Sequence, residues 1–374
     1  MAVVYVKRVE TYDERAVRAA VAEQLDALGV AAELRPGLRV TVKPNLLSGR
    51  KPESGVTTHP AVLAAVIAYL RERGVEAVTV ADSPSGPYVP AALKTAYAAS
   101  GYRRPDIEPY LNYDVAFRRA ATPPGSFVPA FNIIAPLLDA DYIIDLGKLK
   151  THAMTTMTGT VKNLFGAVPG LQKPDLHFQY PELADFSKML CELAALIKPA
   201  VAIADAVDAM EGNGPGGGTV RHAGLLFASR DPFSLDAAAA RFIGLAPEDV
   251  PYLAAARRMG LLTGEPELRG DAFAPADPPF RLPDTIKSVD FTGFLPQFLR
   301  KPAKKFASRA LRAYPQVRKN ACVGCGKCAE SCPQHIIRLE GGKARMTRQG
   351  CISCFCCQEV CPARAIDAKR TVAL

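Results

Sequence analysis

Eight of the ten cysteines in this 374-residue chain repeat one spacing near the C-terminal end. Both runs read C-x2-C-x2-C-x3-C-P, and the second follows the first with every cysteine at the same offset. The first run is Cys322, Cys325, Cys328 and Cys332, and the second is Cys351, Cys354, Cys357 and Cys361. Three thiolates on one tight turn can bind three irons of a cubane, while the fourth ligand comes from the other run. The spacing therefore predicts two [4Fe–4S] clusters.

The interlocked arrangement predicts one ligand set for each cluster. Cluster one takes Cys322, Cys325, Cys328 and Cys361, and cluster two takes Cys351, Cys354, Cys357 and Cys332. Zinc sites built from two C-x2-C pairs would leave two cysteines of each run unexplained, and disulfides need an oxidising compartment. Cys356 lies outside the spacing and is interpreted as a spare thiol, whereas Cys191 lies on an apolar helical face and is expected in the core.

The segment from residue 319 to the C-terminus resembles the bacterial two-cluster ferredoxins in this whole cysteine pattern. Between the runs, residues 336–339 and 343–346 flank Gly341 and Gly342, which predicts a short hairpin. The resemblance implies a small α+β electron-transfer module whose partner is an electron donor or acceptor protein.

The elements before this module alternate between apolar strands and amphipathic helices. Expected strands cover residues 2–9, 38–43, 76–81, 141–146, 200–204 and 224–229. Expected helices include residues 13–28, 61–73, 91–100, 183–197 and 231–243. This alternation predicts an α/β fold, with a mostly parallel sheet covered by helices in Rossmann-like layers. The predicted organisation is an α/β domain at 1–290, a basic linker at 291–318 and the two-cluster domain at 319–374.

Several cationic and amide side chains follow the expected strand at residues 141–146. Ligands of open parallel sheets bind beyond the carboxyl ends of the strands. The candidate catalytic residues are Lys148, Lys150, His152 and Lys162. The candidate substrate-binding residues are Asn45, Asn163, Asn213 and Arg221. Such a group suits a small carboxylate or phosphate, and His152 could transfer a proton near neutral pH. The alternative is that these lysines face solvent.

The expected loop at residues 205–219 carries two other patterns. Residues 212–217 formally fit G-x-G-x-x-G, but a dinucleotide site needs a helix after the last glycine, and here a strand follows. Asp205, Asp208 and Glu211 could chelate a divalent ion, although capping explains them at least as well. His59 precedes a helix and is interpreted as a capping residue.

Composition and charge limit the class of protein. Hydrophobic residues make up 49% and charged residues 22%, and no stretch is long enough to span a membrane, so a cytoplasmic protein is expected. The net charge of +9 is partly concentrated in the linker. That stretch is interpreted as a solvated linker in preference to a surface that contacts a membrane or an acidic redox partner. No recognition motif for nucleic acid accompanies the charge.

Six short motifs of the large domain together resemble the family named domain of unknown function 362. They are Val42-Lys43-Pro44-Asn45, Thr57-Thr58-His59-Pro60, Asp82-Ser83-Pro84, Lys148-Leu149-Lys150-Thr151-His152, Val161-Lys162-Asn163-Leu164-Phe165-Gly166 and Glu211-Gly212-Asn213-Gly214-Pro215. Members of that family often carry a C-terminal ferredoxin module. The resemblance covers nearly the whole chain and implies an iron–sulfur protein without specifying its reaction.

Two hypotheses of function follow. The first is an iron–sulfur oxidoreductase that passes electrons through two [4Fe–4S] clusters to a small anionic substrate in the α/β domain. The sequence has no flavin or nicotinamide motif, so either the substrate is reduced directly or an additional, unknown cofactor takes part. The alternative is a non-enzymatic electron carrier or assembly factor, which predicts a shallow protein-binding surface around residues 148–163.

Overall fold

Eight strands of the first 270 residues form one mixed sheet, which confirms the expected α/β class. The structure is a computed structural model that describes residues 2–286 and 313–369. Within these ranges the sheet has eight strands in the order β10-β1-β9-β8-β6-β2-β3, with β7 paired to β6. They are β1 (Val3–Arg8), β2 (Val40–Pro44), β3 (Val78–Val80), β6 (Tyr142–His152), β7 (Thr156–Thr158), β8 (Val201–Glu211), β9 (Thr219–Ser229) and β10 (Glu267–Gly270). β3, β2, β6 and β8 are parallel neighbours, whereas β9 runs antiparallel to β8 and β1.

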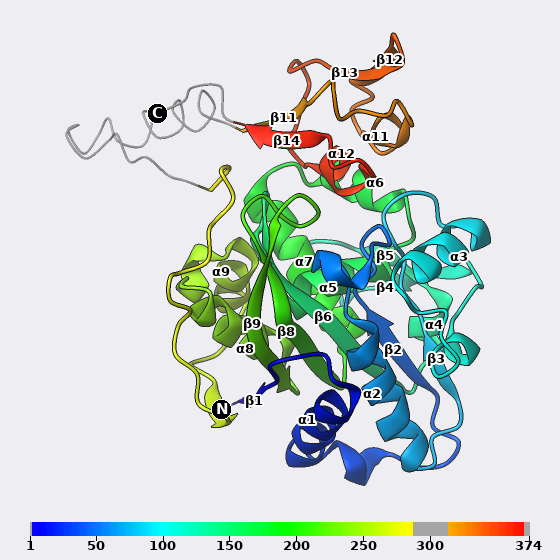
Figure 1. Cartoon of the computed structure of the whole chain (residues 1–374), viewed down its shortest axis with the longest axis vertical. Helices are drawn as coiled ribbons and strands as arrows, with labels where there is room; N and C mark the ends of the chain where they lie inside the picture. Colours follow the sequence, from blue (N-terminus) through cyan, green and yellow to red (C-terminus); the bar gives the residue numbers. More distant parts are fainter. Residues whose placement is uncertain (1, 287–312, 370–374) are drawn as a thin grey trace, which may run out of the picture.

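Helices cover both faces of this sheet, as Figure 1 shows. One layer contains α1 (Glu14–Ala27), α2 (Pro60–Glu72) and α3 (Pro90–Ala99), which pack in one apolar core with β2, β3 and one face of β6. The other contains α7 (Leu183–Ile197), α8 (Pro232–Phe242) and α9 (Pro251–Arg258), which pack in a second core. Cys191 is fully buried in this second core, which confirms its expected place. The apolar strand residues thus face helices on both sides, as parallel strands require.

Two strands are longer than expected, and this changes where the candidate residues lie. β6 continues through His152 instead of ending near residue 146, and β8 continues through Glu211 into what was expected as loop. The extension of β6 is possible because β7 turns back and pairs with residues 150–152. β8 and β9 form a long hairpin, so the glycine-rich segment 212–218 joins two strands. This arrangement confirms that the segment is not a dinucleotide loop.

Smaller elements complete the α/β domain. An antiparallel hairpin, β4 (Phe117–Ala121) and β5 (Ala130–Ile134), leads into α4 (Ala135–Leu138). After β7 come the one-turn helix α5 (Thr160–Asn163) and α6 (Gln172–Gln179). The His59 side chain accepts a hydrogen bond from the backbone of Ala61 at the start of α2, which confirms its capping role.

Residues 313–369 form a second unit, called the cysteine module below. It contains β11 (Tyr314–Val317), α11 (Lys327–Glu330), β12 (Ile337–Glu340), β13 (Lys343–Met346), α12 (Cys356–Glu359) and β14 (Ile366–Lys369). β11 pairs with β14, so Tyr314–Val317 belong to the module, although they fall in the predicted linker. β12 and β13 pair with Glu340 opposite Lys343, which confirms the hairpin around Gly341 and Gly342. Most of the expected linker, residues 287–312, lies outside the described residues.

The cysteine module lies against the α/β domain through its second cysteine segment. In Figure 1, α12 lies next to the α/β domain near α6, while the β12–β13 hairpin is at the far end. Phe355 packs with Ala153 and Met154 of the α/β domain. Arg50 donates to the backbone carbonyl oxygens of Cys361 and Pro362, the second at 2.7 Å. No helix in the described ranges is both long and apolar enough to cross a bilayer.

Candidate functional site

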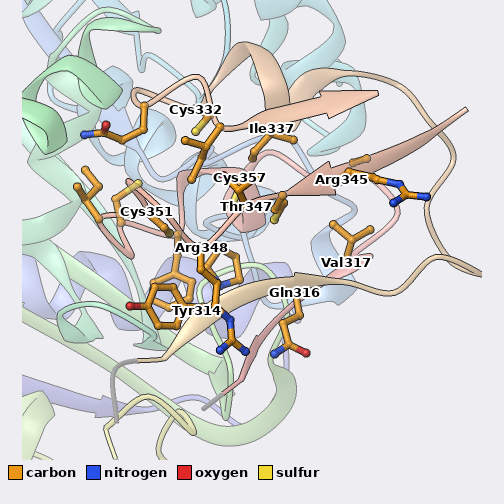
Figure 2. A pocket seen from close by; sticks show the side chains of 18 of the residues that line it. Tyr314, Gln316, Val317, Cys332, Ile337, Arg345, Thr347, Arg348, Cys351 and Cys357 are labelled. Atoms are coloured by element: carbon orange, nitrogen blue, oxygen red, sulfur yellow. The ribbon is translucent and has the colours of Figure 1, made fainter. Parts of the chain in front are cut away.

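Eight thiols of the cysteine module line two separate cavities. The first cavity, of about 350 Å³, contains Cys332, Cys351, Cys354 and Cys357 in its wall (Figure 2). The second is lined by Cys322, Cys325, Cys328 and Cys361. Each cavity takes three cysteines from one run and the fourth from the other. Four thiols around a space, instead of four thiols meeting at a point, fit a cubane cluster.

Backbone amides point at three of these sulfur atoms. Ala344 N donates to Cys322 Sγ at 3.4 Å, Ser353 N to Cys351 Sγ at 3.4 Å and Ala365 N to Cys361 Sγ at 3.3 Å. The contact from Ala344 is the main reason why the pKa of Cys322 is lowered. Amide donors stabilise thiolates and the negative charge of a thiolate-bound cluster. The loop geometry also needs glycine, because a Cβ at Gly324 would lie 2.3 Å from the carbonyl oxygen of Gly342.

Cys356 lies between the cysteine cavities and the α/β domain. Its thiol is buried and interacts with Cys354, and this hydrogen bond together with burial raises the pKa of Cys356 well above its usual value. It also lines a small hollow with His177 of α6 and Glu359 of α12. A protonated thiol in this position agrees with the interpretation of Cys356 as a residue outside the eight-cysteine pattern.

A second candidate site lies where α12 meets the α/β domain, and we call it the cationic hollow. Its cavity measures about 40 Å³, which is room for a few water molecules. The charged and titratable side chains that line it are Lys150, His152, Lys162, Lys173, Asp82 and Glu359. All six are buried. The hollow therefore combines cations of the α/β domain with one carboxylate of the cysteine module.

His152 and Glu359 form the contact between the two units inside the hollow. His152 Nε2 lies 3.2 Å from Glu359 Oε1. His152 Nδ1 accepts hydrogen bonds from Met154 N at 3.0 Å and Thr155 N at 3.3 Å. Since Nδ1 is an acceptor, the neutral ring carries its proton on Nε2 and donates it to Glu359. Burial and the nearby Lys162 lower the pKa of His152 to about 4, so the ring is neutral at pH 7.

Glu359 is charged in spite of its burial. Burial alone would raise its pKa, but Lys162 and the hydrogen bond from His152 outweigh that effect and lower the pKa to about 2. Lys162 has its ammonium 5.6 Å from the ring centroid of Phe165, within range of a cation–π contact. Glu359 is therefore a carboxylate that already interacts with Lys162 and His152 in the hollow.

Lys150 heads a chain of buried hydrogen bonds. Its Nζ donates to Asn45 Oδ1 at 2.8 Å and to the carbonyl oxygen of Val56 at 2.6 Å. Asn45 Nδ2 then donates to Asn163 Oδ1 at 2.8 Å, and Asn163 Nδ2 donates to Asp145 Oδ1 at 2.7 Å. Burial and the neighbouring cations Lys162 and Lys148 lower the pKa of Lys150 to about 7. Lys150 can therefore gain or lose a proton near neutral pH.

Lys173 on α6 is a second buried amine with the same property. Its Nζ donates to Ser83 Oγ at 3.1 Å, and burial lowers its pKa to about 7. His177, one turn later on α6, stacks on Phe186, and burial lowers its pKa to about 3. Nδ1 of His177 has no hydrogen-bond partner among the described residues.

Three of the predicted site residues lie elsewhere. Lys148 forms a buried ion pair with Asp205 at 2.8 Å and donates to the hydroxyl oxygen of Tyr12 at 2.7 Å. A register shift between Lys148 and Lys150 in the pairing of β6 with β8 separates their environments. Arg221 pairs with Glu211 at 3.1 Å and donates to backbone oxygens of residues 278–279. Asn213 exchanges hydrogen bonds of 2.9 Å with Asp284.

The acidic residues considered for a divalent ion are engaged by other partners. Asp205 binds Lys148 and accepts from Tyr12, and Asp208 pairs with His222 at 3.0 Å. Glu211 pairs with Arg221 and with Arg281. The side chains of all three residues therefore form ion pairs within the α/β domain, a role that neither the capping nor the chelation interpretation predicted.

Three residues of the hollow were not among the candidates predicted from the sequence, namely Lys173, Asp82 and Glu359. Asp82 forms a buried ion pair with Lys43 at 2.8 Å. Lys43 could have pointed to Asp82, because a charged residue within the apolar run that forms β2 requires a buried partner of opposite charge. Glu359 had no such signal, because it lies among the cysteines of the second run and reaches the hollow only through the contact between the two units.

Comparisons with known proteins agree with these two units. The profile of the family described as Domain of unknown function (DUF362) matches residues 40–241, and that of the 4Fe-4S dicluster domain matches residues 314–362. A thylakoid-associated protein of Synechocystis sp. is 36% identical over 312 residues, which is 82% of this chain and 94% of that protein.

A more distant likeness is found among solved structures. The lactate racemase apoprotein from Thermoanaerobacterium thermosaccharolyticum aligns with a TM-score of 0.41 and 12% identity, over 65% of this chain and 57% of the other. The family match and the cyanobacterial relative confirm the resemblance of the six motifs and of the cysteine pattern. This chain belongs to the DUF362 family, and its C-terminal part is a 4Fe–4S dicluster domain.

Proposed function

We propose that this protein is an iron–sulfur oxidoreductase that reduces a small anionic substrate in the cationic hollow. When bound, two [4Fe–4S] clusters supply electrons one at a time. The observation that carries the proposal is the contact between Glu359 and His152, 3.2 Å apart. Glu359 lies two residues from Cys357 and two from Cys361, so the wall of the hollow and the cysteine cavities share one short helix.

The charges in the hollow support an anionic substrate. Lys150, Lys162 and Lys173 line it, and Glu359 supplies a carboxylate next to Lys162 and His152. A substrate carboxylate or phosphate would displace Glu359 and take over its interactions with these two residues. Because the cavity holds only a few water molecules, binding also requires α12 to move away from β6.

The pKa values favour lysines as the proton donors. A two-electron reduction of a double bond also consumes two protons. His152 is neutral at pH 7, and its Nδ1 is occupied by two backbone donors, so it acts as a hydrogen-bond donor through Nε2. Lys150 and Lys173, with pKa values of about 7, can each deliver one proton and regain it from solvent.

The proposal includes the ligands of each cluster. Cluster one takes Cys322, Cys325, Cys328 and Cys361, and cluster two takes Cys351, Cys354, Cys357 and Cys332. The grouping of these thiols around two cavities supports the assignment. We further propose that the α/β domain and the cysteine module work as two domains of one cytoplasmic protein. An electron-carrier protein reduces its clusters after each turnover.

The experiment is a single-turnover reoxidation. Anaerobic protein with reduced clusters is mixed with a panel of small carboxylates and phosphates, and recovery of the visible cluster absorbance is followed. We expect at least one compound to reoxidise the wild type, and Lys162→Ala to slow this reaction about 100-fold or more, since charge next to the substrate is lost.

The matched control is Lys94→Ala, which removes an exposed lysine of α3. Iron content and initial absorbance should be the same in all three proteins. Equal reoxidation rates in Lys162→Ala and wild type would refute the proposal that the hollow is the substrate-binding site. Reoxidation by no member of the panel would favour the non-enzymatic carrier.

A further inference from the structure

The small hollow that Cys356 and His177 line adjoins the cationic hollow, and we call it the side hollow. It measures about 20 Å³, which is room for one water molecule. Four side chains line both cavities, namely Ser85, Phe165, Lys173 and Glu359. The two spaces therefore meet at these side chains, and a ligand larger than one carboxylate has a second space beside the first.

His177 is a buried histidine of the side hollow with an unused hydrogen-bonding atom. The residue is 2% exposed, and its Nδ1 has no hydrogen-bond partner among the described residues. The ring stacks on Phe186 with 4.2 Å between centroids and makes an edge-to-face contact with Phe165 at 5.6 Å, so aromatic contacts fix its orientation. Buried polar atoms are nearly always paired in folded proteins. The unpaired nitrogen therefore calls for a partner from outside the chain.

Lys173 lies at the junction of the two cavities. It comes four residues before His177 on α6, so both side chains project from one face of this helix. Its Nζ donates to Ser83 Oγ at 3.1 Å and to the carbonyl oxygen of Pro84 at 3.4 Å. A lysine ammonium has three N–H bonds, so one remains for a ligand.

The cationic hollow has an unpaired group of its own, the hydroxyl of Thr158. Thr158 is directly opposite Lys150 in the pairing of β7 with β6, and both line this cavity. Its Oγ1 is buried and has no hydrogen-bond partner in the part of the chain that the structure describes. Lys150 uses two of its three N–H bonds, on Asn45 and Val56. Each cavity therefore contains an unpaired polar side chain beside a lysine.

The charges of the two cavities favour a ligand with two negative groups. The three lysines Lys150, Lys162 and Lys173 line the cationic hollow, and the third also lines the side hollow. Of the two carboxylates that line the cationic hollow, Asp82 is already paired with another lysine at 2.8 Å. Glu359 is the other, and the proposed function has the substrate displace it. A single ligand carboxylate would then balance only one of the three lysines.

We propose that the substrate is a small dicarboxylate, with one carboxylate beside Lys162 and His152 and the other in the side hollow beside His177. Neutral His177 with its proton on Nδ1 donates to the second carboxylate, and the hydroxyl of Thr158 donates to the first. Lys173 then lies between the two carboxylates, where the proposed function needs a proton donor. This inference rests on the proposed function, because it specifies the substrate class of the same site.

The test measures binding to the anaerobic holoprotein with oxidised clusters, in which no substrate can be reduced. Malonate, succinate and glutarate are compared by calorimetry with the monocarboxylates of equal chain length, propionate, butyrate and valerate. At least one dicarboxylate should bind at least tenfold more tightly than its matched monocarboxylate. Inorganic phosphate, which carries two charges on one centre, should bind more weakly than that dicarboxylate.

Two variants of His177 test its part in this preference. His177→Phe removes the donor and keeps an aromatic ring to stack on Phe186. It should weaken binding of the preferred dicarboxylate tenfold or more and leave binding of the matched monocarboxylate within about twofold. His177→Asn offers an amide donor near the position of Nδ1, so it should lose less than threefold.

The matched control is His222→Phe, the same change at an exposed position of β9. It should bind every compound within about twofold of the wild type. Iron content and denaturant midpoints of all variants show whether each one is folded. The comparison of dicarboxylate with monocarboxylate in the wild type does not depend on any variant.

A dicarboxylate preference smaller than tenfold in the wild type would overturn the inference. So would a folded His177→Phe that keeps the preference, or phosphate binding as tight as that of the best dicarboxylate. Reoxidation of reduced clusters by monocarboxylates alone would overturn this inference and leave the proposed function intact. Dicarboxylate binding that depends on His177, without reoxidation by any compound, would support the two-carboxylate site and refute the oxidoreductase.

Discussion

Asp145 shows how a single buried residue sets the electrostatics next to the hollow. It lies within β6 and is fully buried, with one oxygen accepting from Asn163 and the other, Oδ2, without a partner among the described residues. Burial raises its pKa to about 8, although Lys43 and Asn163 act in the opposite direction. At neutral pH this side chain is mostly a neutral acid, so it adds little negative charge to the cations nearby.

The raised pKa of Asp145 predicts a pH-dependent stability. The folded state holds this proton up to about pH 8, whereas the unfolded state releases it near pH 4, so wild-type stability falls as pH rises between these values. The side chain at this position cannot ionise in Asp145→Asn. The free energy of unfolding of this variant should therefore rise relative to that of the wild type by up to about 1.4 kcal/mol per pH unit between pH 5.5 and 8. Denaturant midpoints of the two proteins, measured anaerobically, check this.

The control for that series is Asp185→Asn, an exposed position at the start of α7. Its difference from the wild type should not change over the same pH range. A constant difference between Asp145→Asn and wild type would mean that Asp145 is ionised in the folded protein.

At the scale of elements, α5 is the piece that brings Lys162 and Asn163 to the hollow. Four residues are too few for a stable isolated helix, so tertiary contacts must hold it. Asp236 of α8 does this by accepting hydrogen bonds from Thr160 N at 2.7 Å, Val161 N at 3.0 Å and the hydroxyl of Tyr252 at 2.9 Å. The position before α5 must be glycine, because a Cβ at Gly159 would lie 2.2 Å from Asp236 Oδ1.

Loss of the Asp236 carboxylate should therefore destabilise the folded protein. Asp236→Asn turns an amide group toward at least one backbone donor, and it should lower the free energy of unfolding by about 3 kcal/mol. Asp231→Asn, at the N-terminal cap of the same helix, should cost about 1 kcal/mol or less because asparagine caps equally well. Equal denaturant midpoints for the two variants would contradict the role of Asp236.

At the scale of the molecule, two polar contacts hold the cysteine module onto the sheet. Glu359 reaches His152, and Arg50 reaches the carbonyl oxygens of Cys361 and Pro362. Arg50 lies in the loop between β2 and α2, and burial lowers its pKa, so it is a charge taken partly out of water. A positive charge beside the backbone of Cys361 favours the reduced state of a cluster bound there.

Removing that charge should loosen the module and change its redox chemistry. Arg50→Gln should increase hydrogen exchange of α12 about tenfold and shift the reduction potential of cluster one to a more negative value. The neighbouring, exposed Lys51→Gln should do neither. Exchange mass spectrometry and a potentiometric titration followed by electron paramagnetic resonance measure the two effects. An unchanged reduction potential would mean that the charge of Arg50 does not act on cluster one.

Local sequence determined the parts of this protein that depend on residues close together in the chain. Cysteine spacing, the Gly341–Gly342 hairpin, the cap at His59 and the alternation of strands and helices all arise from short-range geometry, and each is readable without a structure. The predicted end of β6 near residue 146 was wrong, because the extension of this strand depends on pairing with β7 and on partners for its buried polar side chains.

Only the tertiary structure decided which residues share the hollow. Lys148 and Lys150 look equivalent in sequence, yet one pairs with Asp205 and the other faces Asn45. Glu359 is 207 positions from His152, and no local pattern links them. Such contacts follow from how the α/β domain and the cysteine module pack, and packing depends on the shape and charge of whole surfaces. Sequence therefore determined the metal-binding pattern, and the fold determined where it meets the cationic hollow.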